Sequence, residues 1–126
     1  MSKILVADDS ITMRRSIAMS LEFAGHQVVQ AEDGQAALEL LRQGLAPDLI
    51  LTDIVMPRLD GLGLITEARK LLRFTPIIAL TTQSQQTQRD RARQAGATAW
   101  MIKPVGGGEL LRLLSEHLGA RQPAPR

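Results

Sequence analysis

The sequence has no cysteine, very few aromatic residues and no long hydrophobic run. The absence of cysteine excludes disulfide bonds, thiolate metal sites and cysteine nucleophiles, and it fits a reducing compartment. The only aromatic residues are Phe23, Phe74 and Trp100, which argues against base-stacking surfaces and a flavin held between rings. No apolar stretch approaches the roughly 20 residues that span a bilayer, and the first is too short for a signal peptide. We therefore expect a cytoplasmic protein that does not insert into a membrane.

The chain also lacks a strong excess of charge. Its formal net charge is +2 over 126 residues, too little by itself to indicate nucleic-acid binding, and we expect none. Hydrophobic residues make up 44% and charged residues 22%, as in an ordinary globular protein. This length predicts a single domain, which we place at residues 1–118, followed by a flexible tail at 119–126 that has no apolar stripe.

Strand and helix patterns alternate along the chain. Short apolar runs typical of buried strands lie at residues 4–7, 27–31, 49–52, 77–81 and 99–102. Stripes of apolar residues at helical spacing follow four of these runs, and glycines lie where the helices should stop, as at Gly25, Gly44, Gly96 and Gly119. Residues 106–108 are three glycines, which we read as a flexible loop before the fifth helix. This order predicts an α/β fold with a five-stranded parallel sheet and helices on both faces.

Acidic side chains follow two of these strands. Asp8 and Asp9 come directly after the first run, and Asp53 follows the third. If the two strands are neighbours, all three carboxylates meet at one edge, where ligands of such sheets bind. Each pair would repel by roughly 4 kcal/mol at 4 Å and an effective dielectric near 20. The cluster therefore predicts a hard divalent cation held by oxygen atoms.

Two further strand ends carry Thr81 and the pair Lys103-Pro104. Taken in order, five features resemble the receiver domain of two-component response regulators, over about residues 3–118. They are Asp8, Asp9, Asp53, Thr81 and the pair Lys103-Pro104. Within that family the stretches 8–14 and 96–104 are most similar to stand-alone chemotaxis regulators of the CheY type. The resemblance implies the flavodoxin-like (βα)5 fold and a phosphoacceptor switch rather than an ordinary enzyme.

The resemblance also implies residue roles. Asp53 would accept a phosphoryl group from a histidine kinase, because a carboxylate is a competent covalent acceptor. Asp8, Asp9, Asp53 and the main-chain carbonyl of Val55 would hold Mg²⁺. The ligands of the phosphoryl oxygens would be Lys103 and Thr81, with Lys103-Pro104 as a cis peptide.

Trp100 occupies the position where the family usually has a rotating Tyr or Phe. A phosphorylation-driven shift of Thr81 would reach Trp100 and the face formed by the fourth helix, fifth strand and fifth helix. Residues 82–94 contain one apolar member, Ala92, which predicts a polar surface helix of low stability on that face. In the chemotaxis interpretation the donor is a chemotaxis histidine kinase and the partner a flagellar motor switch protein, with the receiver itself a monomer.

Three positions would tune the lifetime of the phosphorylated state: Val55, Thr82 and Gln83. Val55 cannot orient a water by hydrogen bonding, and Gln83 is a poor general base. We therefore expect slow loss of phosphate, with a separate phosphatase as a further partner.

Rival interpretations remain open at this point. The chain could be a phosphate sink or relay without an output target, a receiver from a longer transcriptional regulator, or an unrelated Mg²⁺-dependent phosphohydrolase. Dehalogenase-type phosphatases carry a second aspartate two residues after the nucleophile, and neither Asp8 nor Asp53 has one. The glycine-rich loop of nucleotide-binding proteins is also absent.

Overall fold

Five strands alternate with five helices in the computed structural model, which describes residues 2–81 and 86–121. The order is β1 (Lys3–Ala7), α1 (Ile11–Phe23), β2 (Gln27–Ala31), α2 (Gly34–Arg42), β3 (Leu49–Asp53), α3 (Gly61–Leu71), β4 (Ile77–Thr81), α4 (Gln86–Ala95), β5 (Ala99–Ile102) and α5 (Gly107–Arg121). The five predicted strands are all confirmed, with ends that differ by at most one residue.

All strand pairs are parallel, and the sheet order is β2-β1-β3-β4-β5. The chain winds outward from β1 to β2 and then returns across β1 to place β3 on its other side. In the register, Ala7 lies opposite Thr52, so the residues after β1 and the last residue of β3 are neighbours. This is the flavodoxin-like order, and β1/β3 is the switch point at which such sheets bind ligands.

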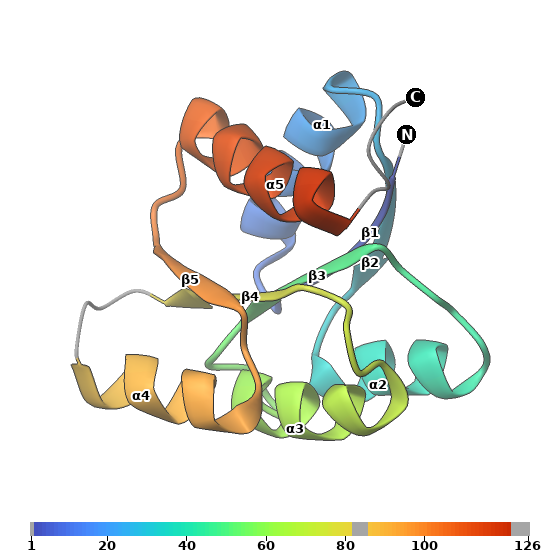
Figure 1. The fold of residues 1–126 in the computed structure, drawn as a ribbon, viewed down its shortest axis with the longest axis vertical. Helices are drawn as coiled ribbons and strands as arrows, with labels where there is room; N and C mark the ends of the chain where they lie inside the picture. The colour runs from blue at the N-terminus through green and yellow to red at the C-terminus, as the bar shows by residue number, and fades with distance from the viewer. Residues whose placement is uncertain (1, 82–85, 122–126) are drawn as a thin grey trace.

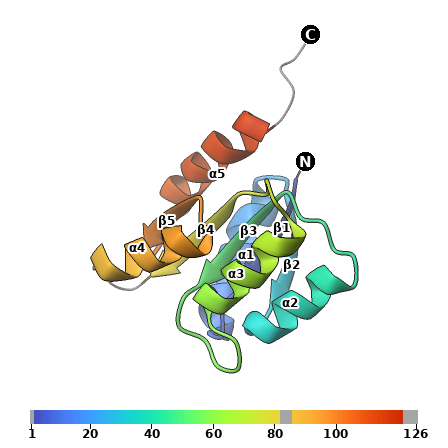
Figure 2. The same ribbon diagram turned by 60° about the horizontal axis from the view of Figure 1, so that its bottom comes forward.

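Helices cover both faces of the sheet (Figure 1). α1 and α5 pack on one face, where they bury Ile17, Leu21 and Leu114 against residues of β1, β3 and β4. The other three helices lie on the opposite face, and Figure 2 shows α2 beside α3. Because both faces are covered, every residue of β3 and β4 is buried, which explains why these strands are apolar up to the polar residues at their carboxyl ends.

Side-chain caps begin three of the helices. Ser10 caps α1 and accepts a hydrogen bond through Oγ from the Met13 amide at 3.3 Å. Asp33 caps α2 and Asp60 caps α3 in the same way. An aspartate or serine at this position satisfies amides that the helix leaves unpaired.

Two expectations about the fifth helix are wrong. Residues 107 and 108 are not part of a loop, because α5 begins at Gly107 and includes both glycines in its first turn. The helix also continues past Gly119 to Arg121, so residues 119–121 are helical instead of beginning the tail. The remainder of the predicted tail, 122–126, lies outside the described residues.

The polar fourth helix is present as α4. Its single apolar member in the predicted stretch, Ala92, is completely buried against the core. Residues 82–85 lie outside the described residues. Within the described ranges, none of the helices is both long and apolar enough to cross a bilayer.

Candidate functional site

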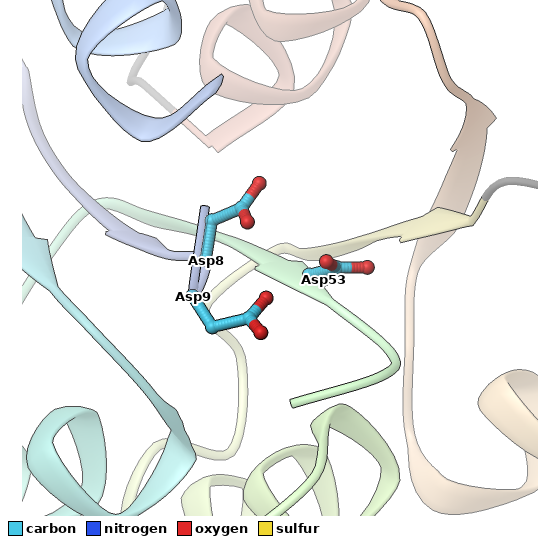
Figure 3. Close-up of side chains that lie close together, drawn as sticks. All are labelled: Asp8, Asp9 and Asp53. Carbon is cyan, nitrogen blue, oxygen red and sulfur yellow. The ribbon is translucent and has the colours of Figure 1, made fainter. Parts of the chain in front are cut away.

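Three carboxylates converge where β1 and β3 end (Figure 3). Asp8 and Asp9 follow β1, and Asp53 is the last residue of β3. One oxygen from each lies within 4.8 Å of the others. Asp8 is fully buried and Asp53 is 7% exposed, whereas Asp9 faces solvent. The strand pairing thus confirms that the three acids meet at one edge of the sheet.

Lys103 reaches this cluster from the end of β5. Its Nζ lies 3.0 Å from Oδ2 of Asp53 and 3.5 Å from Oδ2 of Asp8. The ammonium is well shielded, with the side chain 11% exposed. The Lys103–Pro104 peptide is cis, as predicted. The Lys103 amide donates to the carbonyl of Thr81 at 2.7 Å, which fixes the end of β5 against the end of β4.

Backbone amides donate hydrogen bonds to the carboxylate oxygens of Asp53 and Asp8 that do not face Lys103. Oδ1 of Asp53 accepts from the Ile54 amide at 2.8 Å, and Oδ1 of Asp8 accepts from the Ser10 amide at 2.9 Å. Each buried acid is therefore held by a main-chain donor on one oxygen and faces Lys103 with the other. Such fixed donors set the direction of the carboxylates before any ligand arrives.

The electrostatics of the site are unbalanced. Three carboxylates face one ammonium, which leaves two negative charges without a partner inside the cluster. Burial raises the pKa of Asp53, and the charge of Asp8 raises it further, although Lys103 and the Ile54 amide oppose the shift. Burial lowers the pKa of Lys103, but hydrogen bonds and charge from Asp53 and Asp8 outweigh it, so the net shift is upward.

The donor set fits a small, hard cation. All three side chains offer oxygen, and the oxygens are close enough for one Mg²⁺ and its waters to contact them all. A divalent ion would cancel the two unbalanced charges. The residues present therefore match the group that the sequence predicted.

Thr81 lies at the end of β4, and Val55 lies just beyond the end of the neighbouring strand β3. Thr81 ends β4 and is 3% exposed, opposite Ile102 in the β4–β5 register. Val55 follows β3 by two residues, and its side chain is exposed. The other two residues predicted to tune phosphate loss, Thr82 and Gln83, lie outside the described residues.

Trp100 lies in the middle of β5, opposite Ala79 of β4. Its ring is half-buried and packs against the core between the sheet and the helices α2–α4. Cζ of Arg89, from α4, lies 5.4 Å from the ring centroid. Arg89 thus joins the polar helix to the strand that carries the predicted switch residue.

A hollow of about 300 Å³ lies between β5 and α5. Its lining combines apolar and charged side chains: Trp100, Met101, Ile102, Leu113, Glu109, Arg112 and Glu116. The face predicted to bind a partner is therefore concave here.

Two contacts near the site were not predicted from the sequence. Arg14, on α1, donates through Nη1 to the carbonyl of Asp8 at 2.7 Å and through Nε to Oε1 of Gln30. Arg58 forms two hydrogen bonds with Asp33. No sequence motif marks either arginine, because each partner lies on a different element.

The chain is similar to known proteins over nearly its whole length. The family model described as "Response regulator receiver domain" matches residues 4–115. The transcriptional regulatory protein PdtaR of Mycobacterium tuberculosis is 38% identical over 110 residues, which are 86% of this chain and 53% of that protein. The chain spans about half the length of PdtaR and of other curated relatives that it matches.

Solved structures agree with this match. The chemotaxis protein CheY4 of Vibrio cholerae is 34% identical with a TM-score of 0.88, and the similarity covers 93% of this chain and 98% of that one. The receiver domain of the sensor histidine kinase PA1611 from Pseudomonas aeruginosa is 32% identical with a TM-score of 0.86. The similarity covers 94% of this chain and 98% of that one. That receiver was solved with a magnesium ion in its active-site cleft.

The family match, the sheet order and the acidic site at its β1/β3 edge lead to one assignment. A receiver is a phosphoacceptor switch of two-component signalling rather than a classical enzyme. The chain belongs to the response regulator receiver domain family.

Proposed function

We propose that Asp53 accepts a phosphoryl group from a phosphohistidine of a histidine kinase. The observation that carries this proposal is the position of Asp53: at the β3 end, beside Asp8 and 3.0 Å from Lys103. In the transfer, the bond from phosphorus to the histidine nitrogen breaks and a bond to Oδ of Asp53 forms. The histidine nitrogen leaves with the electron pair and takes up a proton.

Asp8, Asp9, Asp53 and the Val55 carbonyl are the proposed ligands of Mg²⁺. When bound, the ion would neutralise charge on the phosphoryl oxygens and on the carboxylates. The magnesium ion in the PA1611 receiver supports this assignment. Asp8 and Asp53 are already oriented by the amides of Ser10 and Ile54, so little rearrangement of the ligands is needed.

Lys103 and Thr81 are the proposed ligands of the phosphoryl oxygens. Lys103 already pairs with the Asp53 oxygen that faces it, so phosphorylation would shift this contact to a phosphoryl oxygen. Thr81 is buried at the adjacent strand end and would move toward the new charge. Phosphorylation adds strong acceptor oxygens, and a hydrogen bond from the Thr81 hydroxyl to one of them would stabilise the shifted position.

The output surface in this proposal is the face formed by α4, β5 and α5. Trp100 would reposition when Thr81 moves, and the hollow between β5 and α5 would change shape. α4 carries three arginines, at positions 89, 91 and 93, and one acidic residue, Asp90. This excess of positive charge suits an acidic partner. A partner that prefers the altered face would shift the population toward it.

Chemotaxis is the signalling process that we favour, with a flagellar motor switch protein as the partner. The similarity to CheY4 over almost the whole of both chains supports it. We place the protein in the cytoplasm as a monomer, where a histidine kinase and a separate phosphatase would act on it. Val55, Thr82 and Gln83 would give a phosphorylated state that persists for longer than seconds without that phosphatase.

A second candidate is the receiver of a longer transcriptional regulator. The similarity to PdtaR favours it, because this chain matches about half of that protein. Reading the gene beyond the codon for Arg126 distinguishes the two: an in-frame domain that binds nucleic acid supports the second candidate, and a stop codon supports the first.

Phosphotransfer profiling tests the proposed function. Purified protein and Mg²⁺ are incubated with radiolabelled histidine kinases of the same cell, beside an Asp53→Asn variant. We expect rapid labelling by one kinase and none of the variant. Subsequent loss of the label back to a histidine protein, with no binding to a motor component, would instead indicate a phosphate sink.

A further inference from the structure

A short loop, residues 54–60, connects β3 to α3 and passes beside the acidic site. Its base is closed by the Gly61 amide, which donates to the Ile54 carbonyl at 2.7 Å. Ile54 is also fixed from the sheet, because its amide donates to the Leu80 carbonyl. The next residue, Val55, carries the carbonyl proposed above to bind Mg²⁺.

The far end of this loop is fastened to α2 by an ion pair. Nε of Arg58 lies 2.8 Å from Oδ2 of Asp33, and Nη2 lies 3.1 Å from Oδ1. Asp33 is almost completely buried, and the paired guanidinium lowers its pKa. A two-point contact of this kind fixes direction as well as distance.

Arg58 adopts a conformation that arginine does not favour on its own. Its φ is 67°, the only positive value among the described residues other than glycine. A side chain with a Cβ is strained in this left-handed region and stays there only when its surroundings hold it. Release from Asp33 would allow Arg58 to return to an ordinary conformation and change the course of the loop.

A second contact beside the pair brings the same two segments together. The Gly34 amide, at the start of α2, donates to the Leu59 carbonyl at 3.1 Å. A Cβ on Gly34 would overlap that oxygen, so the glycine is needed for the loop to approach this closely. The loop is therefore attached at its base to the sheet and at its far end to α2.

We propose that Arg58 is a positioning residue for the metal site. Its pairing with Asp33 holds the loop so that the main-chain carbonyl of Val55 meets the ion. Val55 lies between the two attachments, and Met56 beside it is buried in the core. This inference rests on the proposed function, because it requires Mg²⁺ at the acids and at Val55.

The test is the dissociation constant of Mg²⁺, measured by calorimetry on folded protein. Arg58→Gln removes the positive charge and the two-point contact of the guanidinium with Asp33. Asp33→Asn removes the negative charge, while the asparagine can still cap α2. We expect each to raise the Kd about tenfold, the low end for residues that orient metal ligands. The double variant should weaken binding no more than either single variant, since both remove the same contact. Arg58→Lys should recover part of the affinity.

Arg42→Gln is the matched control. Arg42 also pairs with an acid, Glu67, and its side chain is 56% exposed against 58% for Arg58. It should leave the Kd of Mg²⁺ unchanged. If Arg58→Gln lowers the melting temperature but keeps the wild-type Kd, the pair has only a structural role and the inference is overturned.

The outcomes also separate this inference from the proposed function. Wild-type protein that takes phosphate on Asp53 and binds Mg²⁺, with Arg58→Gln binding equally well, overturns the inference alone. Wild-type protein that shows no saturable Mg²⁺ binding overturns the metal site and, with it, the inference.

Discussion

The ammonium of Lys103 lies 3.0 Å from the carboxylate of Asp53, across 50 positions of sequence. This contact joins the ends of β5 and β3, the strands on either side of β4. Lys103 also pairs with Asp8, so one ammonium offsets part of the repulsion between these two buried carboxylates. Lys103 does not neutralise the site, since one ammonium cannot balance the charge of three carboxylates.

Magnesium should therefore stabilise the folded protein. At a concentration one hundred times its Kd, a ligand of the native state adds about 2.7 kcal/mol, or roughly 10 °C in melting temperature for this size. Thermal melts with Mg²⁺ and with EDTA measure this shift. Asp9→Asn, which removes an exposed carboxylate, should lose most of it. An equal shift in the variant would contradict the proposed ligand set.

The pairing of Arg58 with Asp33 predicts a pH effect from a carboxylate outside the acidic cluster. The folded pKa of Asp33 lies below its usual value, chiefly because Arg58 donates to it. The ionised carboxylate therefore stabilises the fold above about pH 4, and this contribution disappears as the pH falls through the folded pKa. Urea denaturation at pH 6 and pH 3 should show a stability gap between wild type and Asp33→Asn that shrinks in acid. A gap that widens would refute this.

Trp100 is the only tryptophan, so its fluorescence reports on the switch directly. Phosphorylation should change its emission in wild-type protein. Thr81→Val keeps the shape of the buried side chain but removes the hydroxyl, so the variant should accept phosphate and lose most of the emission change. A full change in the variant would show that Thr81 does not couple the site to Trp100. Asp53→Asn provides the unphosphorylated baseline.

The contact between Arg89 and Trp100 should hold α4 against β5. Its guanidinium is 5.4 Å from the ring centroid, a contact worth about 1 kcal/mol. Arg89→Gln should lower the free energy of unfolding by about that amount and alter Trp100 emission without phosphate. Arg91→Gln, an exposed arginine on the same helix, is the control. If both variants behave alike, general helix charge is responsible and not the ring contact.

Much of the fold and of the site could be predicted from sequence because both depend on local patterns. Buried parallel strands are short apolar runs, and the residue after each run falls at the ligand-binding edge. This pattern predicts that Asp8, Asp53 and Lys103 lie at the same edge of the sheet. The cis Lys103–Pro104 peptide came from the family resemblance.

Contacts between separate elements were not predictable in this way. Arg14 and Arg58 resemble ordinary surface arginines in the sequence, and only the fold brings them to Asp8 and Asp33. The start of α5 was missed for a different reason. Gly107 and Gly108 disfavour a helix by propensity, but Leu110 and Leu114 bury the following turns against the sheet.

The central claim is that Asp53 is the phosphoacceptor. The most direct measurement is intact-protein mass spectrometry after incubation with Mg²⁺ and a phosphorylated histidine kinase. We predict one added phosphoryl group on wild-type protein and none on Asp53→Asn, with Asp8 and Asp9 unmodified in peptide maps. One added phosphoryl group on Asp53→Asn would contradict the account.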